Sequence, residues 1–350
     1  SCYGKIMKDN QQKSILIIGG GLAGITLAHH LLKRKQLVTL IDDGKNVSTR
    51  VAAGLVNPLV FRRTTLSWRA TEFLIEGWEF YKELEKTLNT PLVEPIRIKR
   101  VFPSSQERDE WKKKEDLTEF KSHLLKIPSS SHSQSFGIVK SGYAVHSENF
   151  YIKNHQYFDD LGILKREAFD YLSYSPSESC YQGVVYDHVV FCCGYRVFEN
   201  PFFKDCQVKP TKGQMLIIHH EELPETESLH LKCFVFPLGN KMFRVGATYE
   251  WDNVSLSPTK KAKETLLAHL THLTKAVPVV VSQPVGIRPT TMDRRPVLGS
   301  HPTFKNTHVF NGLGAKGYLI APTMAKEMVQ YLLDKRIIPK EYSISRHQAL

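Results

Sequence analysis

The 350-residue sequence has no apolar run long enough to cross a lipid bilayer, so no transmembrane segment is expected. Its first residues, SCYGKIMKDNQQK, lack the apolar centre of a signal peptide. Residues 1–12 are therefore expected to form a disordered tail. The six cysteines include no C-x-x-C pair, and no metal site is predicted. We interpret these cysteines as reduced thiols of a cytoplasmic protein.

The sequence also lacks a long run of basic residues, although its formal net charge is +12. The positive side chains are scattered through short segments such as WKKKEDL and PTKKAKE. RNA or an acidic membrane surface would suit this charge, and so would simple solubility. Nucleic acid stays open as a partner but is not favoured, because no aromatic-interleaved RNA motif accompanies the charge.

A glycine-rich turn between two apolar runs is present in residues 14–43, SILIIGGGLAGITLAHHLLKRKQLVTLIDD. The pattern predicts strand, glycine turn, helix, strand and acid, which is the βαβ unit that binds dinucleotides. Gly19 permits the tight turn, Gly21 lets a pyrophosphate approach the backbone, and Gly24 lets the helix pack closely on the strands. Asp42 can accept hydrogen bonds from an adenosine ribose. The unit alone does not distinguish NAD from FAD.

The remaining chain alternates predicted helices and strands. Helices are expected over residues 68–88, 106–125 and 258–276, and a hairpin is expected around Gly239 and Asn240. A second glycine loop before a helix, GLGAKGYLIAP, lies near the C-terminus and resembles another anion-facing helix start.

Two such loops, one near each end, predict an α/β fold with a Rossmann-like cofactor domain built from discontinuous segments and a strand-rich α+β substrate domain. The expected cofactor domain comprises residues 13–88, 141–205 and 285–345. The expected substrate domain comprises residues 89–140 and 206–284.

These blocks resemble the D-amino-acid oxidase family of FAD-dependent oxidoreductases, whose relatives include glycine and sarcosine oxidases. The resemblance extends from Ile15 to about Leu333 and includes STRVAAGLVNP, VVFCCG, VKPTKGQ, FVFPLGNKMFRVGATYEW and GIRPTTMDRRPVLG in the family's order. It favours FAD over NAD. Since no cysteine lies in the C-terminal flavin-facing blocks, non-covalent FAD is expected.

The resemblance also implies the residues that contact FAD. These are Gly19, Gly21, Leu22, Ala23, Gly24, Asp42, Ser48, Thr49, Ala53, Gly54, Leu55, Cys193, Gly194, Gly312, Gly314, Ala315, Lys316, Gly317 and Tyr318.

The family's chemistry implies hydride transfer from a C–H bond beside an amine to flavin N5, followed by hydrolysis of the imine. Arg288, in GIRP, matches the position whose guanidinium pairs a substrate carboxylate, and a planar guanidinium suits that task. Tyr249 is a second candidate for the substrate pocket, whereas Arg294 and Arg295 are expected to face solvent. No catalytic base is assigned, because none is required if the amine arrives neutral.

One departure concerns the substrate. Several amino-acid oxidases have a Tyr where this chain has Phe234. The absence of that tyrosine hydroxyl counts against a plain small amino acid as the substrate. The predicted substrate is therefore an amino acid or a secondary amine, with oxygen or a quinone as the electron acceptor. A flavin oxidase of a carboxymethylaminomethyl-type modified tRNA base, and a non-catalytic flavin-binding module, are the alternatives.

Overall fold

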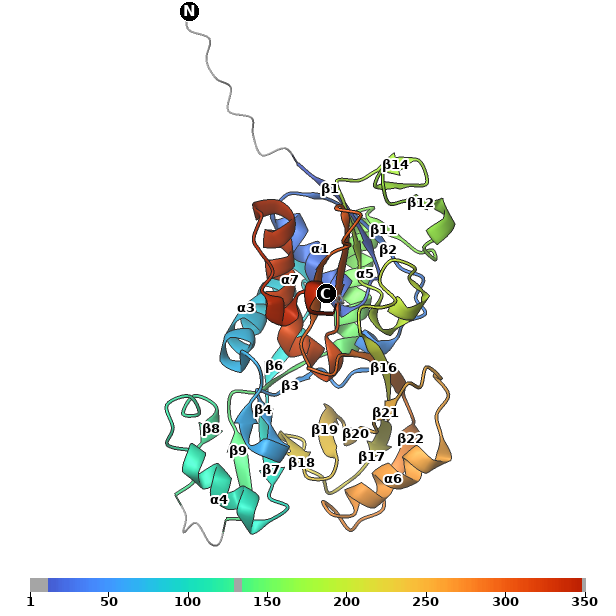
Figure 1. Ribbon diagram of the computed structural model, residues 1–350. Helices are drawn as coiled ribbons and strands as arrows, with labels where there is room; N and C mark the ends of the chain where they lie inside the picture. The colour runs from blue at the N-terminus through green and yellow to red at the C-terminus, as the bar shows by residue number, and fades with distance from the viewer. Residues whose placement is uncertain (1–11, 129–133, 348–350) are drawn as a thin grey trace, which may run out of the picture.

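The computed structural model describes residues 12–128 and 134–347, so all but Gln12 of the expected tail lies outside the described residues. A six-stranded sheet forms the upper part of the molecule in Figure 1. Its first five strands are parallel and the last is antiparallel. In spatial order they are β11 (Leu164–Lys165), β2 (Leu37–Ile41), β1 (Ser14–Ile18), β15 (His188–Phe191), β25 (Thr307–Asn311) and β24 (Val297–Ser300).

Both faces of this sheet are covered, as the unbroken apolar run of β1 requires. Ile15 and Ile17 pack into one hydrophobic core, and Leu16 and Ile18 pack into another, because successive side chains of a strand point to opposite faces. The first core is shared with helices α1 (Leu22–Lys33), α3 (Ala70–Leu88), α5 (Ser147–Asp160) and α7 (Gly317–Asp334). The second includes aromatic residues of the small sheet β12 (Tyr174–Ser175), β13 (Cys180–Tyr181) and β14 (Val184–Val185).

An eight-stranded sheet forms the lower part of the molecule (Figure 1). Its strands, in spatial order, are β22 (Val279–Ser282), β17 (Leu216–His219), β20 (Met242–Gly246), β19 (Phe234–Gly239), β18 (Glu227–His230), β7 (Arg97–Val101), β9 (Phe136–Val139) and β8 (Leu124–Leu125). Helix α6 (Lys260–Leu270) buries Leu266 and Leu270 against one half of it. Helix α4 (Ser105–Lys114) buries Trp111 against the other half.

A third sheet lies between these two parts (Figure 1). It consists of β21 (Glu250–Trp251), β16 (Lys209–Gln214) and β23 (Val285–Thr290). The shorter elements are α2 (Ser48–Val51), the pair β4 (Leu59–Val60) and β5 (Thr65–Leu66), and the sheet β3 (Leu55–Val56), β10 (Tyr143–Val145) and β6 (Val93–Pro95). None of the helices in the described part of the chain is long and apolar enough to span a bilayer.

The fold class predicted from the sequence is confirmed, and so is the hairpin of β19 and β20, where Gly239 and Asn240 have positive φ. Two predicted helices are shorter than expected. Helix α6 spans Lys260–Leu270 rather than residues 258–276. Helix α4 ends at Lys114 rather than extending to residue 125. Phe120 and Leu124 are buried with the lower sheet, so the chain turns there and enters β8 instead of continuing as a helix.

Two neighbouring strands of the upper sheet bring a histidine pair together. His188 Nδ1 of β15 and His308 Nε2 of β25 are 2.9 Å apart. Burial lowers the pKa of His308 from 6.5 to about 3. The unfolded chain binds a proton near pH 6.5, whereas the folded chain keeps this imidazole neutral until about pH 3. This group therefore lowers the free energy of unfolding as the pH falls through that window.

We expect His308→Gln to make the pH dependence of stability shallower between pH 6 and 4, by up to roughly 1.4 kcal/mol per pH unit, the slope of one proton. Denaturant unfolding at several pH values measures this slope. His272→Gln, at an exposed position, is the matched control and should leave the slope unchanged. An unchanged slope in His308→Gln would show that this imidazole is not buried as a neutral group.

Candidate active site

Two glycines where β1 meets α1 lie against backbone atoms that leave no room for a side chain. Gly19 has a φ of +109°, and a Cβ there would lie 2.2 Å from the carbonyl oxygen of Cys192. A Cβ on Gly24 would lie 1.8 Å from the carbonyl oxygen of Gly19. These contacts agree with the tight turn and the close helix packing expected from the sequence. They bring the start of α1 directly to the ends of β1 and β15.

The start of α1 faces a cavity. Gly21, the residue before the helix, offers no side-chain cap, and the hydroxyl of Thr49 accepts a 2.8 Å hydrogen bond from the Leu22 backbone N–H instead. A Cβ on Gly21 would meet only that Thr49 oxygen, at 3.1 Å. Backbone N–H groups at a helix start, with open space in front of them, suit an anionic phosphate.

Asp42 lies at the end of β2 beside this turn. Its Oδ1 accepts a 3.1 Å hydrogen bond from the Gly20 backbone N–H, and its Oδ2 accepts one of 3.1 Å from the Tyr151 hydroxyl. The ring of His155 packs on that of Tyr151, with centroids 4.0 Å apart. Tyr151 and His155, both on α5, were not predicted from the sequence. They hold the carboxylate in place at the cavity wall.

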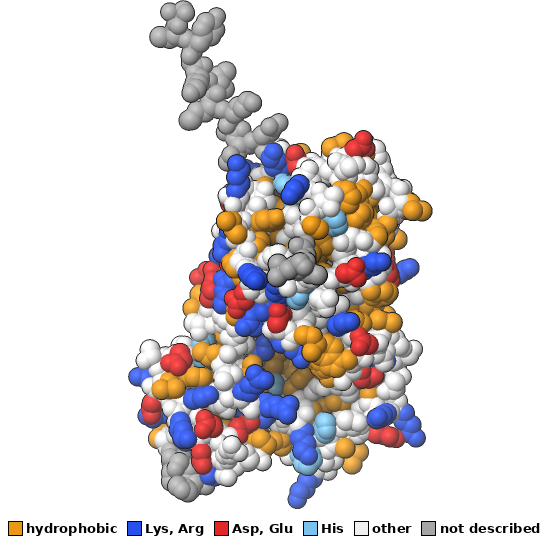
Figure 2. All heavy atoms as spheres, in the orientation of Figure 1, with side chains coloured by type: hydrophobic (Ala, Val, Ile, Leu, Met, Phe, Trp, Pro, Cys, Tyr) orange, Lys and Arg blue, Asp and Glu red, His pale blue; other side chains and the backbone are white. Residues whose placement is uncertain are grey.

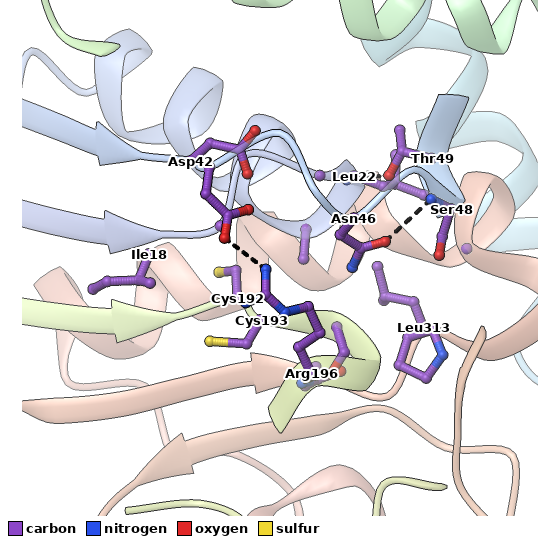
Figure 3. A pocket seen from close by; sticks show the side chains of 18 of the residues that line it. Ile18, Leu22, Asp42, Asn46, Ser48, Thr49, Cys192, Cys193, Arg196 and Leu313 are labelled. Atoms are coloured by element: carbon purple, nitrogen blue, oxygen red, sulfur yellow. Dashed lines mark hydrogen bonds and ion pairs between the residues drawn. The ribbon is translucent and has the colours of Figure 1, made fainter. Parts of the chain in front are cut away.

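The cavity encloses about 1290 Å³, including open space at its mouth. Of the residues predicted to contact the cofactor, thirteen line it: Gly19, Gly21, Leu22, Ala23, Asp42, Ser48, Thr49, Cys193, Gly194, Gly314, Ala315, Gly317 and Tyr318. Figure 3 shows side chains from three distant parts of the chain around this space, represented by Asp42, Cys193 and Leu313. The cavity is therefore assembled from segments that lie far apart in the sequence.

Several of the residues that line the cavity were not predicted from the sequence. Asn46, Phe169, Tyr171 and Arg196 also line it, and the Arg196 guanidinium pairs with Asp43 at 2.7 Å (Figure 3). Desolvation opposes ionisation of Asp43, but its bonds to Arg196 and Lys45 hold the pKa of the carboxyl below its usual value. Asn46 lies in the segment between Asp42 and Ser48, whereas the fold brings Phe169, Tyr171 and Arg196 here from far along the chain, where no local motif marks them.

The other predicted residues lie outside the cavity lining. They are Gly24, Ala53, Gly54, Leu55, Gly312 and Lys316, together with the substrate candidate Tyr249. Two of these glycines serve packing. A Cβ on Gly54 would lie 1.9 Å from the carbonyl oxygen of Val145, and one on Gly312 would lie 3.1 Å from the backbone nitrogen of Val297.

Lys316 precedes α7 and points towards backbone carbonyl groups. Its ammonium donates hydrogen bonds to the carbonyl oxygens of Asn57 at 2.9 Å and Leu59 at 3.0 Å. Burial lowers the pKa of this ammonium from 10.5 to about 8. The side chain thus joins the start of α7 to the segment after β3.

Arg288 of β23 lines the same cavity. Both terminal nitrogens of its guanidinium are 3.4 Å from the carbonyl oxygen of Thr248, at the outer limit of a hydrogen bond. Within residues 12–128 and 134–347 it forms no ion pair, and burial lowers its pKa. A Cβ on Gly213 would lie 2.4 Å from Arg288 Nη2, so this glycine leaves the space that the guanidinium fills. A desolvated cation without an anionic partner is a receptor for an anion.

Tyr249 lies beside Arg288, with its ring centroid 4.9 Å from the Arg288 Cζ atom. It is 41% exposed and therefore stands at the edge of the site rather than within the cavity. The hydroxyl of Tyr249 accepts a hydrogen bond from the guanidinium of Arg294.

Residues 14–331 match the family described as FAD dependent oxidoreductase (DAO). The chain belongs to this family. Glycine oxidase of Bacillus subtilis is 23% identical over 353 residues, which cover 92% of this chain and 93% of that protein. The crystal structure of glycine oxidase from Geobacillus kaustophilus has a TM-score of 0.79 at 18% identity and covers 97% of this chain and 100% of that one. L-proline dehydrogenase from P. horikoshii has a TM-score of 0.77 at 15% identity, with 97% and 98% covered.

The cofactor is therefore FAD, held non-covalently, and the chain is an FAD-dependent oxidoreductase. The geometry fits this cofactor. The space in front of Gly21 and the N-terminus of α1 suits the diphosphate, and the fixed carboxylate of Asp42 suits a ribose. The cavity continues from there to Arg288.

Two substitutions in the glycine turn should separate cofactor binding from folding. Gly21→Val should leave the fold intact but weaken FAD binding about tenfold or more, because its side chain would occupy the phosphate space. Gly24→Ala should destabilise the protein, because its Cβ collides with the Gly19 carbonyl. Flavin titration of the apoprotein and circular dichroism measure the two effects. Wild-type FAD affinity in Gly21→Val would contradict the assignment of the phosphate space.

Proposed function

We propose that this protein oxidises the C–N bond of an amino acid or of a secondary amine that carries a carboxylate. The observation that supports this most directly is the guanidinium of Arg288, which lines the FAD cavity, is partly buried and forms no ion pair with any described residue. The similarity of the whole chain to glycine oxidase of Bacillus subtilis supports the same substrate class. When bound, FAD would accept the hydride at N5 from the C–H bond next to the amine, and the resulting imine would be hydrolysed by water.

The chain's own residues would supply binding and orientation. Arg288 would bind the substrate carboxylate through two charge-assisted hydrogen bonds, and Thr248 and Tyr249 would hold the guanidinium in place. This fixes the orientation of the carbon next to the amine. We assign no catalytic base, because a neutral amine needs none to lose a hydride.

The surface charge favours an anionic substrate. On the face drawn in Figure 2, Lys and Arg side chains gather around the hollowed middle of the molecule, where the upper and lower parts meet. A positive field around a hollow raises the rate at which small anions reach it. Oxygen or a quinone is proposed as the acceptor.

Arg288→Gln should lower kcat/KM for the best substrate by on the order of 10- to 100-fold, because the carboxylate loses charge-assisted bonds. An anaerobic flavin-reduction screen over amino acids and N-substituted glycines identifies that substrate. FAD content should be unchanged. Arg295→Gln is the control, because Arg295 pairs with Glu341 and contacts Trp68 instead.

Unchanged turnover in Arg288→Gln would contradict the proposal that Arg288 binds the substrate carboxylate. If no amine reduces the flavin while FAD stays tightly bound, the non-catalytic module becomes the better account. Oxidation of a modified tRNA base instead requires salt-sensitive RNA retention, which a binding assay at low salt measures.

Gly213→Ala offers an independent test of the same anchor. Its Cβ would displace the Arg288 guanidinium, so KM should rise several-fold while FAD content stays constant. Gly286→Ala is a matched control, because Gly286 pairs with Gly213 across the sheet and its Cβ would meet nothing closer than 3.6 Å. Equal KM values in the two variants would argue against Arg288 as the anchor.

A further inference from the structure

A second guanidinium group lies next to Arg288. The Cζ atoms of Arg288 and Arg294 are 4.9 Å and 5.5 Å from the centroid of the same Tyr249 ring. The two Cζ atoms are therefore separated by no more than the sum of these two distances. Their proximity is also felt electrostatically, since Arg294 contributes to the lowered pKa of Arg288 after the larger effect of burial.

The carboxylate closest in sequence to Arg294 is committed to another residue. Asp293 pairs with Arg346, at 2.8 Å, and also accepts the backbone N–H of Arg295. Arg294 itself donates to the neutral Tyr249 hydroxyl and forms no ion pair with any residue that the structure describes. Two guanidinium groups are thus held together without an anion, an arrangement that a bound anion would stabilise.

Aromatic side chains fix Arg294 at the mouth of the site. Its Cζ atom is 5.4 Å from the Trp251 ring as well, and the Tyr249 and Trp251 rings meet edge to face at 5.7 Å. Arg294 is exposed, and Met292 beside it is 77% exposed. A guanidinium packed beside aromatic rings can offer its other N–H donors to a planar acceptor, so the aromatic pair presents Arg294 to an incoming ligand.

We propose that Arg294 binds a second acidic group of the substrate, so that the substrate class is amines with two carboxylates. Arg288 takes one carboxylate and Arg294 takes the other, at the outer edge of Tyr249. This assignment rests on the proposed function, because it uses Arg288 as the first anchor. It makes Arg294 a specificity-determining residue rather than a surface charge that only packs on two aromatic rings.

Binding of unreactive carboxylates to the oxidised holoenzyme tests this without turnover. Acetate, malonate, succinate and glutarate are titrated, and the flavin absorption spectrum reports binding. At least one dicarboxylate should bind about tenfold or more tightly than acetate, as expected for one additional charge-assisted pair. Arg294→Gln should remove that preference, so that the dicarboxylate and acetate bind with similar affinity. Arg295→Gln, with its guanidinium paired to Glu341, should keep it.

The outcomes separate the two proposals. If acetate binds in an Arg288-dependent way but no dicarboxylate binds more tightly, or if Arg294→Gln keeps the preference, the role of Arg294 is wrong and the proposed function stands. If no carboxylate perturbs the flavin, and Arg288→Gln changes nothing, the proposed function fails and this inference fails with it.

Discussion

The contact between α1 and the end of β1 is the constraint on which the rest of the structure depends. Gly24 lies against the carbonyl of Gly19, and Gly19 lies against the carbonyl of Cys192. No side chain fits between these backbones, so the helix start, the end of β1 and the end of β15 share one small space. Thr49, from a segment that follows β2, completes the arrangement by accepting the N–H of Leu22. The FAD cavity lies directly in front of these atoms.

The substrate end depends on how the third sheet joins this cofactor cavity. The hydroxyl of Ser48 donates to the carbonyl oxygen of Ile287 at 2.6 Å, and so fixes β23 beside the segment that lines the cavity. Arg244 of β20 also donates to the carbonyl oxygens of Val51 and Ala52. The Arg244 bonds join the lower sheet to the cofactor segment. The Ser48 bond places Arg288, which follows Ile287 in β23, at the cavity wall.

The sequence predicted those parts of the site that are encoded locally. Gly19, Gly24 and Asp42 fall within one βαβ unit, where spacing alone implies their proximity. Tyr151 and Arg196 could not be predicted, because helix and sheet packing brings them to Asp42 and Asp43 from far along the chain. Gly54 and Gly312 matched family blocks, and a Cβ on either would crowd the neighbouring backbone. A glycine needed for close packing and one needed for a ligand have the same sequence signal. The direction of Lys316 was likewise set by the carbonyl groups it meets.

We hold that the guanidinium of Arg288, which has no ion-pair partner in the part of the chain that the structure describes, receives the substrate carboxylate in the FAD cavity. A crystal structure of the FAD-loaded protein with acetate tests it most directly. The account predicts acetate oxygens within hydrogen-bond distance of both terminal nitrogens of Arg288, next to the flavin ring. Acetate bound elsewhere, or an Arg288 guanidinium that pairs with a phosphate of FAD instead, would contradict it.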